Sequence, residues 1–303
     1  MHPAELAILL HRALEVRLAR LQELLGKDLW NDDREQLHQV RVAARRLGAV
    51  LDLVDADNYP GHKGQRRALK GLVDLLGLPR ELDVHAETLG ACHREARTPT
   101  QAAVLEYLLE QVDHGRAKAR RTLAKALDRL RLPDLRRLLE VPALQHPFQS
   151  TSLQEAAWLC LEPRIGGALG GLGALAAQED PLALHRTRVK IKKLRYALEA
   201  LEGAFAEPPE PVLKGVRALQ AALGEHHDLA SLEALLWATE TQLRARDRPT
   251  LRAGLLDLLA EVAERRRSVF DRFVALIPGQ EPAALARVLR PALGLPPADG
   301  GPA

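Results

Sequence analysis

The 303-residue chain contains an internal repeat, in which the second half matches the first after a shift of 147 residues. The shift carries His38 onto His185 and Arg41 onto Arg188, and no gap is needed. Leucine matches arise by chance in such a leucine-rich chain, but matched histidine and arginine positions do so far less often. Self-similarity over this length indicates a duplicated folding unit. The repeat predicts three segments: residues 1–147, residues 148–295, and a Pro-, Gly- and Ala-rich disordered tail, 296–303.

Each half has the apolar spacing of an amphipathic helix. Residues that recur at intervals of three and four lie on one helix face. The stripe in the first half consists of Leu37, Val40, Ala44, Leu47, Leu51 and Val54, and its repeat of Leu184, Thr187, Ile191, Leu194, Leu198 and Leu201. Hydrophobic residues make up 47% of the chain but aromatic residues only 3%, a composition that suits helices better than sheets. The sequence therefore predicts an all-α protein.

Start and stop signals divide each half into about four helices. Helix ends are marked by Gly26, Asn58-Tyr59-Pro60-Gly61, Gly77-Leu78-Pro79, Thr98-Pro99 and Leu132-Pro133. Ser152 and Glu155 have the spacing of a capping box, which predicts that a helix of the second half begins there. Gly77 and its counterpart in the repeat, Gly224, are interpreted as helix C-caps.

Positive charge is concentrated in three segments, although the net charge of the chain is only +3. Segments 38–46, 116–131 and 185–195 together carry +15, which leaves −12 for the rest of the chain. Of the 43 basic residues 34 are arginine, whose forked guanidinium group matches phosphate. Charge focused in this way favours a polyanionic ligand. The alternative for any one segment is a solvated helix face with ion pairs between successive turns.

The repeated basic residues share one helix face in each half. They are His38, Arg41 and Arg45 in the first half, and His185, Arg188, Lys192 and Arg195 in the second. At about 100° per residue, each set flanks the apolar stripe and forms a ridge about 10 Å long. Guanidinium, ammonium and imidazole groups along a ridge suit a chain of phosphates. Arg46 and Lys193 point elsewhere on the helix, toward a second contact or toward solvent.

These motifs resemble those of the CHAD family, the conserved histidine α-helical domain. The residues that carry the resemblance are His38-Gln39-Val40-Arg41-Val42-Ala43-Ala44-Arg45-Arg46-Leu47, its repeat from His185 to Tyr196, and Leu223-Gly224-Glu225-His226-His227-Asp228. The resemblance covers nearly the whole chain and implies two four-helix bundles related by pseudo-twofold symmetry. Between them it implies a basic central cleft or pore that binds inorganic polyphosphate.

The resemblance also implies which residues bind polyphosphate. The cavity residues of the family correspond here to His38, Arg41, Arg45, His185, Arg188, Lys192 and Arg195, supported by Arg17, Arg164, Lys70, Arg217, Arg46 and Lys193. Two positions depart from the repeat. Gly48 stands where an arginine would match Arg195, and Ala230 stands where an acid would match Asp83. The two halves are therefore expected to contribute unequally to the site.

The expected function is non-catalytic binding of polyphosphate, with no cofactor and no metal, in the cytoplasm and at polyphosphate granules. The sequence shows neither a membrane-spanning apolar run nor a secretory signal. Oligomeric state and preferred chain length stay open.

Two other functions are compatible with the sequence. A metal-dependent phosphohydrolase would use His226, His227 and Asp228 as ligands. Against this reading, the repeated histidines are followed one turn later by arginines, which repel a metal ion. Binding of a nucleic-acid backbone would use the same cationic ridges. Against that reading, only Tyr196 supplies an aromatic ring among the basic residues for base stacking.

Overall fold

The computed structural model describes residues 4–26, 34–54, 62–129 and 152–297. Within these ranges every regular element is a helix and no strand occurs, so the predicted all-α class is confirmed. No helix in the described ranges is both long and apolar enough to cross a membrane. The prediction for the tail falls almost entirely on residues outside these ranges.

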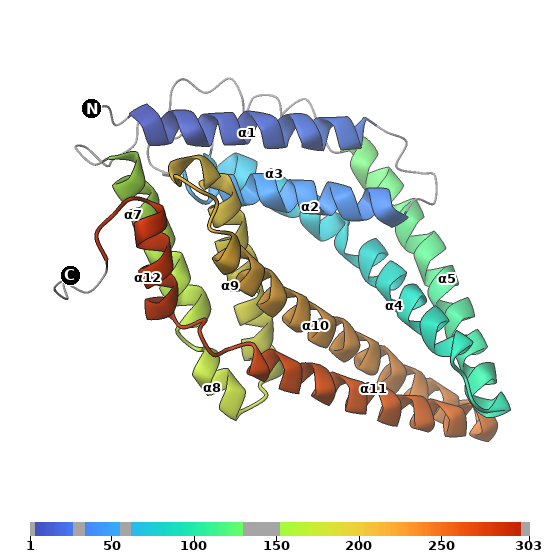
Figure 1. Ribbon diagram of the computed structural model, residues 1–303. Coiled ribbons are helices and arrows are strands. Elements are labelled where there is room, and N and C mark those ends of the chain that lie inside the picture. Colours follow the sequence, from blue (N-terminus) through green and yellow to red (C-terminus); the bar gives the residue numbers. More distant parts are fainter. Residues whose placement is uncertain (1–3, 27–33, 55–61, 130–151, 298–303) are drawn as a thin grey trace.

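The helices follow one another in similar order in the two halves (Figure 1). The first half contains α1 (Ala4–Leu25), α2 (Arg34–Leu51), α3 (His62–Leu75), α4 (Gly77–Arg94) and α5 (Pro99–Arg129). The second contains α7 (Leu153–Leu169), α8 (Leu172–Ala177), α9 (Pro181–Ala200), η1 (Glu202–Ala204), α10 (Glu210–Ala245), α11 (Pro249–Ala275) and α12 (Pro282–Ala292). Shifted by 147, α2 would span 181–198, which is close to the bounds of α9. The bounds of α2 and α9 fit the 147-residue shift, whereas the repeat as a whole and its pseudo-twofold relation stay predictions.

A capping box opens α7, as the sequence predicts. The Ser152 hydroxyl accepts a hydrogen bond from the Glu155 amide at 3.2 Å, and the Ser152 amide donates to the Glu155 carboxylate at 3.0 Å. Both amides would otherwise lack a partner at the helix N-terminus.

The interpretation of Gly77 and Gly224 as helix C-caps is wrong. Gly77 is the first residue of α4, and Gly224 lies inside the continuous helix α10. The physical difference between the two sites is Pro79, which has no amide hydrogen and fits only the first turn of a helix. Its counterpart in the repeat is His226, whose amide allows α10 to continue.

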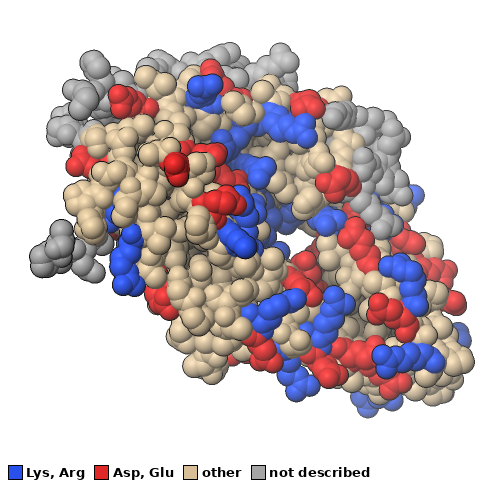
Figure 2. Space-filling model, viewed as in Figure 1, with Lys and Arg blue, Asp and Glu red and all other residues tan. Residues whose placement is uncertain are grey.

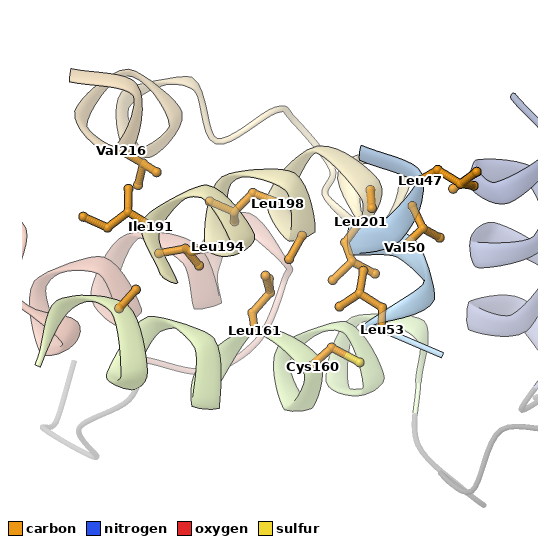
Figure 3. Packing of buried hydrophobic residues seen from close by; sticks show 14 of the residues in the cluster. Leu47, Val50, Leu53, Cys160, Leu161, Ile191, Leu194, Leu198, Leu201 and Val216 are labelled. Atoms are coloured by element: carbon orange, nitrogen blue, oxygen red, sulfur yellow. The ribbon is translucent and has the colours of Figure 1, made fainter. Parts of the chain in front are cut away.

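The hydrophobic core joins the two halves of the chain. Buried leucine, valine and isoleucine side chains from α2, α7, α9 and α10 converge in the larger cluster (Figure 3). A second cluster is built from α4, α5, α10 and α11, which meet at the end of the molecule that lies away from α1 and α7 (Figure 1). Each cluster draws on both halves, so the halves pack as one body. The boundary at residue 147 lies outside the described residues and stays a prediction.

The predicted apolar stripes are buried in the larger cluster. Every stripe residue of α2, including Val54 just beyond its end, is buried, and in α9 only Thr187 is partly exposed. Because both stripes face the same core, α2 and α9 pack together. The basic residues that flank the stripes are thereby brought to the junction of the two helices.

Candidate polyanion-binding site

Four cations meet where α2 and α9 pack together. Arg41 and Arg45 come from α2, and Arg188 and Lys192 come from α9. All four are partly buried. His227, one turn into the Gly224 segment of α10, lies beside them, and its ring centroid is 5.0 Å from that of His185. We call Arg41, Arg45, Arg188, Lys192 and His227 the shared wall, because these five residues line two neighbouring cavities.

The first cavity has a volume of about 320 Å³ and lies between α2, the start of α4, α9 and α10. We call it the His38 cavity, since His38 lines it together with Arg80, Glu81, His85 and Asp228. In the space-filling view, lysine and arginine side chains gather along a hollow in the middle of the molecule, while acidic groups are spread over the surrounding surface (Figure 2).

The second cavity has a volume of about 720 Å³ and lies between α2, α3 and α9. We call it the Gly48 cavity. Its further basic lining residues are Arg66, Arg67, Lys70, His185 and Lys193. A third cavity of about 340 Å³, beside α4, α10 and α11, is also lined by Arg188 and Lys192. Arg188 and Lys192 therefore border all three cavities.

Burial and mutual repulsion make the shared wall electrostatically strained. Burial, reinforced by the charges of Arg45 and Arg188, lowers the pKa of Arg41 to about 10. Burial and the neighbouring arginines lower the pKa of Lys192 to about 7, and burial with Arg188 lowers the pKa of His227 to about 4. Each shift means that the folded protein disfavours the protonated form. An anion placed among these groups relieves that repulsion.

The acids near the shared wall do not neutralise it. Asp228 approaches Arg188 at 3.8 Å, and burial raises the pKa of the Asp228 carboxyl group. The Nε atom of Arg188 is buried and has no hydrogen-bond partner. Glu81 accepts a hydrogen bond from Ser231, which in turn lies 3.1 Å from His85. The site therefore holds more positive charge than its carboxylates balance, and an unpartnered buried donor invites an external acceptor.

The histidines of α10 do not form the metal site that the phosphohydrolase reading requires. His226 is buried, and its Nε2 atom lies 2.8 Å from Glu179 Oε1, on the side of Phe270. His227 points instead toward His185. Across the part of the chain that the structure describes, no three His, Cys, Asp or Glu side chains are placed to hold a metal ion together.

Eight of the predicted site residues line the two cavities: His38, Arg41, Arg45, Lys70, His185, Arg188, Lys192 and Lys193. The structure places the other five elsewhere. Arg46 and Arg195 both pair with Glu199, at 3.2 and 3.4 Å. Arg217 pairs with Glu210.

Arg164 and Arg17 also lie apart from the shared wall. Arg164 donates hydrogen bonds to the carbonyl oxygens of Cys160 and Asp52, and so connects α7 to the end of α2. Arg17 lines a further cavity of about 670 Å³ with Arg46, Arg217 and three glutamates, and His38 borders both this cavity and the His38 cavity. These arginines balance nearby acids or hold helices together.

The described part of the basic segment 116–131, which ends at Arg129, does not line these cavities, and its interpretation as a polyanion face is corrected for its buried members. Arg116 Nε donates to the Asp83 carboxylate at 2.8 Å, and Arg120 Nη2 lies 3.5 Å from the same group. Asp83 is completely buried. These arginines therefore hold α5 against α4.

Sequence reasoning missed Arg80, His85 and Arg66 as lining residues. Arg80 and His85 lie on α4, which begins at Gly77 beside the His38 cavity. The sequence did give one signal for the neighbouring Arg67, because the repeat matches it with Lys214.

The geometry defines a helical protein with partly buried cations around connected cavities. The family model for the CHAD domain matches residues 12–237, most of the chain. The protein belongs to the CHAD domain family, which is linked to polyphosphate binding.

Two solved structures share this fold. One is PptA from Streptomyces chartreusis, with 22% identity, a TM-score of 0.67 and coverage of 88% of this chain and 98% of that one. The other is the CHAD domain from the plant Ricinus communis, with 24% identity, a TM-score of 0.63 and coverage of 88% and 91%. Among curated proteins no match is found.

Proposed function

We propose that the protein binds inorganic polyphosphate on the shared wall, without catalysing a reaction. The observation that carries the proposal is the convergence of Arg41, Arg45, Arg188 and Lys192 from two helices into one partly buried cluster. Burial lowers the pKa of all four groups, and neighbouring cations lower the pKa of Arg41, Arg188 and Lys192 further. A linear polyanion supplies several negative charges to such a cluster at once.

The arrangement of the cavities also suits a linear polymer. The His38 cavity and the Gly48 cavity lie on either side of the same cations, so a chain of phosphates that crosses the wall contacts both spaces. Arginine forks bind phosphate oxygens in pairs, and Lys192 adds a point charge. Binding of this kind would retain the protein at polyphosphate granules.

Two other functions, metal-dependent phosphohydrolysis and binding of a nucleic-acid backbone, have weaker support. His226 is engaged with Glu179 and turned away from His227, so the predicted ligands do not converge. The cations of the shared wall are partly buried between helices, where the phosphates of a wide duplex do not reach all of them together. The separated histidines and the partly buried cations therefore favour binding of a thin, flexible polyanion over either of these functions.

The direct test is calorimetric titration of the protein with long-chain polyphosphate at several salt concentrations, with phosphate release measured in the same samples. We expect binding that weakens steeply with salt, since bound polyanions displace counterions from the site and from the ligand. Arg41→Glu combined with Arg188→Glu should abolish binding while helicity stays unchanged.

A matched control reverses two exposed charges on α9, Arg186→Glu with Lys190→Glu. This control changes the net charge equally but leaves the shared wall intact, so it should retain most of the affinity. Equal losses in the two variants would show that only the overall charge attracts polyphosphate. Sustained phosphate release would show that the protein is an enzyme.

A further inference from the structure

The Gly48 cavity is lined by residues of two chemical kinds. Beside the cationic shared wall, its lining includes Ala44, Ala49, Leu69, Val73, Val189 and Tyr196. Inorganic polyphosphate carries oxygen atoms along its whole length and gains nothing from an apolar surface. The apolar part of the lining therefore fits a ligand that has an organic group attached to its phosphates.

Gly48 keeps this cavity open. A Cβ atom at Gly48 would meet no heavy atom within 4 Å. At the corresponding position of the repeat, the Arg195 guanidinium lies 4.6 Å from the centre of the Tyr196 ring and pairs with Glu199. The first half thus provides free volume where the second half places an arginine.

The rim of the cavity is charged, which restricts the kinds of organic group that can bind there. The Asp52 carboxylate lies 2.6 Å from Arg66 and 3.2 Å from Lys193, and Arg67 also lines the space. A hydrocarbon chain would remove these groups from water without offering hydrogen bonds. A nucleoside has apolar faces for the apolar part of the lining, and donors and acceptors at its edges for Asp52 and the arginines.

We propose that the Gly48 cavity accepts the nucleoside of a nucleoside 5′-polyphosphate whose phosphates lie on the shared wall. The volume of about 720 Å³ is that of an ordinary small-molecule site. Because the phosphates use Arg41, Arg188 and Lys192, this inference rests on the proposed function. It adds a second class of ligand that competes with polyphosphate for the same cations.

The test compares ATP with tripolyphosphate, which carries a similar phosphate chain without the nucleoside. Both are titrated calorimetrically at one ionic strength without divalent cations. We expect ATP to bind about tenfold more tightly, because burial and hydrogen bonding of one base add roughly that much affinity. ATP should also displace polyphosphate at lower concentration than tripolyphosphate does.

The decisive variant is Gly48→Leu, which fills the cavity from a position where the new side chain meets open space. Leucine also has a higher helix propensity than glycine, so α2 should stay folded. We expect the variant to bind ATP no more tightly than tripolyphosphate, and to bind tripolyphosphate within about twofold of the original affinity. Gly71→Leu is the matched control, because Gly71 is exposed on α3, also faces open space and lies outside the cavity. It should change neither affinity.

Three results would overturn the inference. One is equal affinity of the unmodified protein for ATP and tripolyphosphate. Another is a Gly48→Leu variant that keeps the preference for ATP or loses both ligands equally. The third is an affinity for geranyl diphosphate that exceeds the affinity for pyrophosphate by the same factor as ATP exceeds tripolyphosphate. That result would assign the cavity to hydrocarbon groups. Tight binding of long-chain polyphosphate alongside any of these results would leave the proposed function standing.

Discussion

The Arg188 guanidinium lies 3.8 Å from the Asp228 carboxylate, close enough for attraction but too far for a hydrogen bond. Burial raises the pKa of Asp228, so this carboxyl group is a weaker counterion than an exposed aspartate. Arg188 also repels Lys192, its neighbour one helical turn away. The cations of α9 are therefore held in a position where an external anion is a better partner than the protein's own acid.

Polyphosphate binding should weaken as the pH rises from 6 to 8. Burial and the neighbouring arginines lower the pKa of Lys192 to about 7, so the free protein loses this charge within the window. Bound phosphates favour the protonated amine, and so the affinity should fall by about tenfold across the window. His227 stays neutral throughout, since its pKa is about 4. Titrations with long-chain polyphosphate at fixed ionic strength measure the effect.

Lys192→Arg provides the control for this pH dependence. Arginine keeps its charge across the window, so the variant should bind with nearly constant affinity. A pH profile that is equally steep in the variant would assign the titration to another group.

Lys192→Met should stabilise the folded protein while it weakens polyphosphate binding. The folded pKa of about 7 lies below the ordinary value of 10.5, so the folded state disfavours the lysine charge. Below pH 7 this cost is fully present, and stability rises with pH between the two values. At pH 6 we expect the free energy of unfolding to increase by about 1 kcal/mol. Urea denaturation at pH 6 and pH 9 should show an advantage that shrinks at the higher pH.

Affinity should increase with the length of the phosphate chain. A longer chain engages several cations of the shared wall together, which raises the effective concentration of each further phosphate. Orthophosphate, tripolyphosphate and long-chain polyphosphate, titrated at equal phosphate concentration, should bind in that order of increasing affinity. Equal affinities would mean that a single phosphate saturates the site.

Asp83→Asn should destabilise the fold without involving the cavities. The substitution leaves Arg116 buried beside an uncharged group, a loss worth about 3 kcal/mol in the free energy of unfolding. Asp113→Asn is the control, since Asp113 pairs with the same arginine at 2.8 Å but is 60% exposed. The Asp113→Asn substitution should lower the free energy of unfolding by less than about 1 kcal/mol. Comparable losses in urea denaturation would contradict the structural role of Asp83.

The periodic parts of the fold are predictable from local sequence. The α2 stripe is buried as expected, because its apolar spacing leaves one face that must avoid water. The capping box at Ser152 depends on two residues three positions apart, and it forms as predicted. The C-cap interpretation failed at both glycines, since Gly77 begins α4 and Gly224 lies inside α10, where His226 stands in place of Pro79.

The site is predictable only in part, since it depends on which helices meet. Arg41 and Arg188 were found from the repeat, and the packing of α2 against α9 brings them together. Arg116 was assigned to a polyanion face, because its partner Asp83 lies 33 residues away and no local pattern connects them. Arg46 was also predicted as a binding residue, and its ion pair with Glu199 could not be foreseen, because the two residues lie far apart in the sequence.

The shared wall takes Arg41 and Arg45 from α2, but Arg188, Lys192 and His227 from α9 and α10. A fragment that ends before α9 would carry two of these five groups and one face of the space. Folding of the complete chain is thus a condition for capture of the polymer. A polymer bound across the junction would in turn oppose separation of the two halves, because it binds only when both halves are packed together.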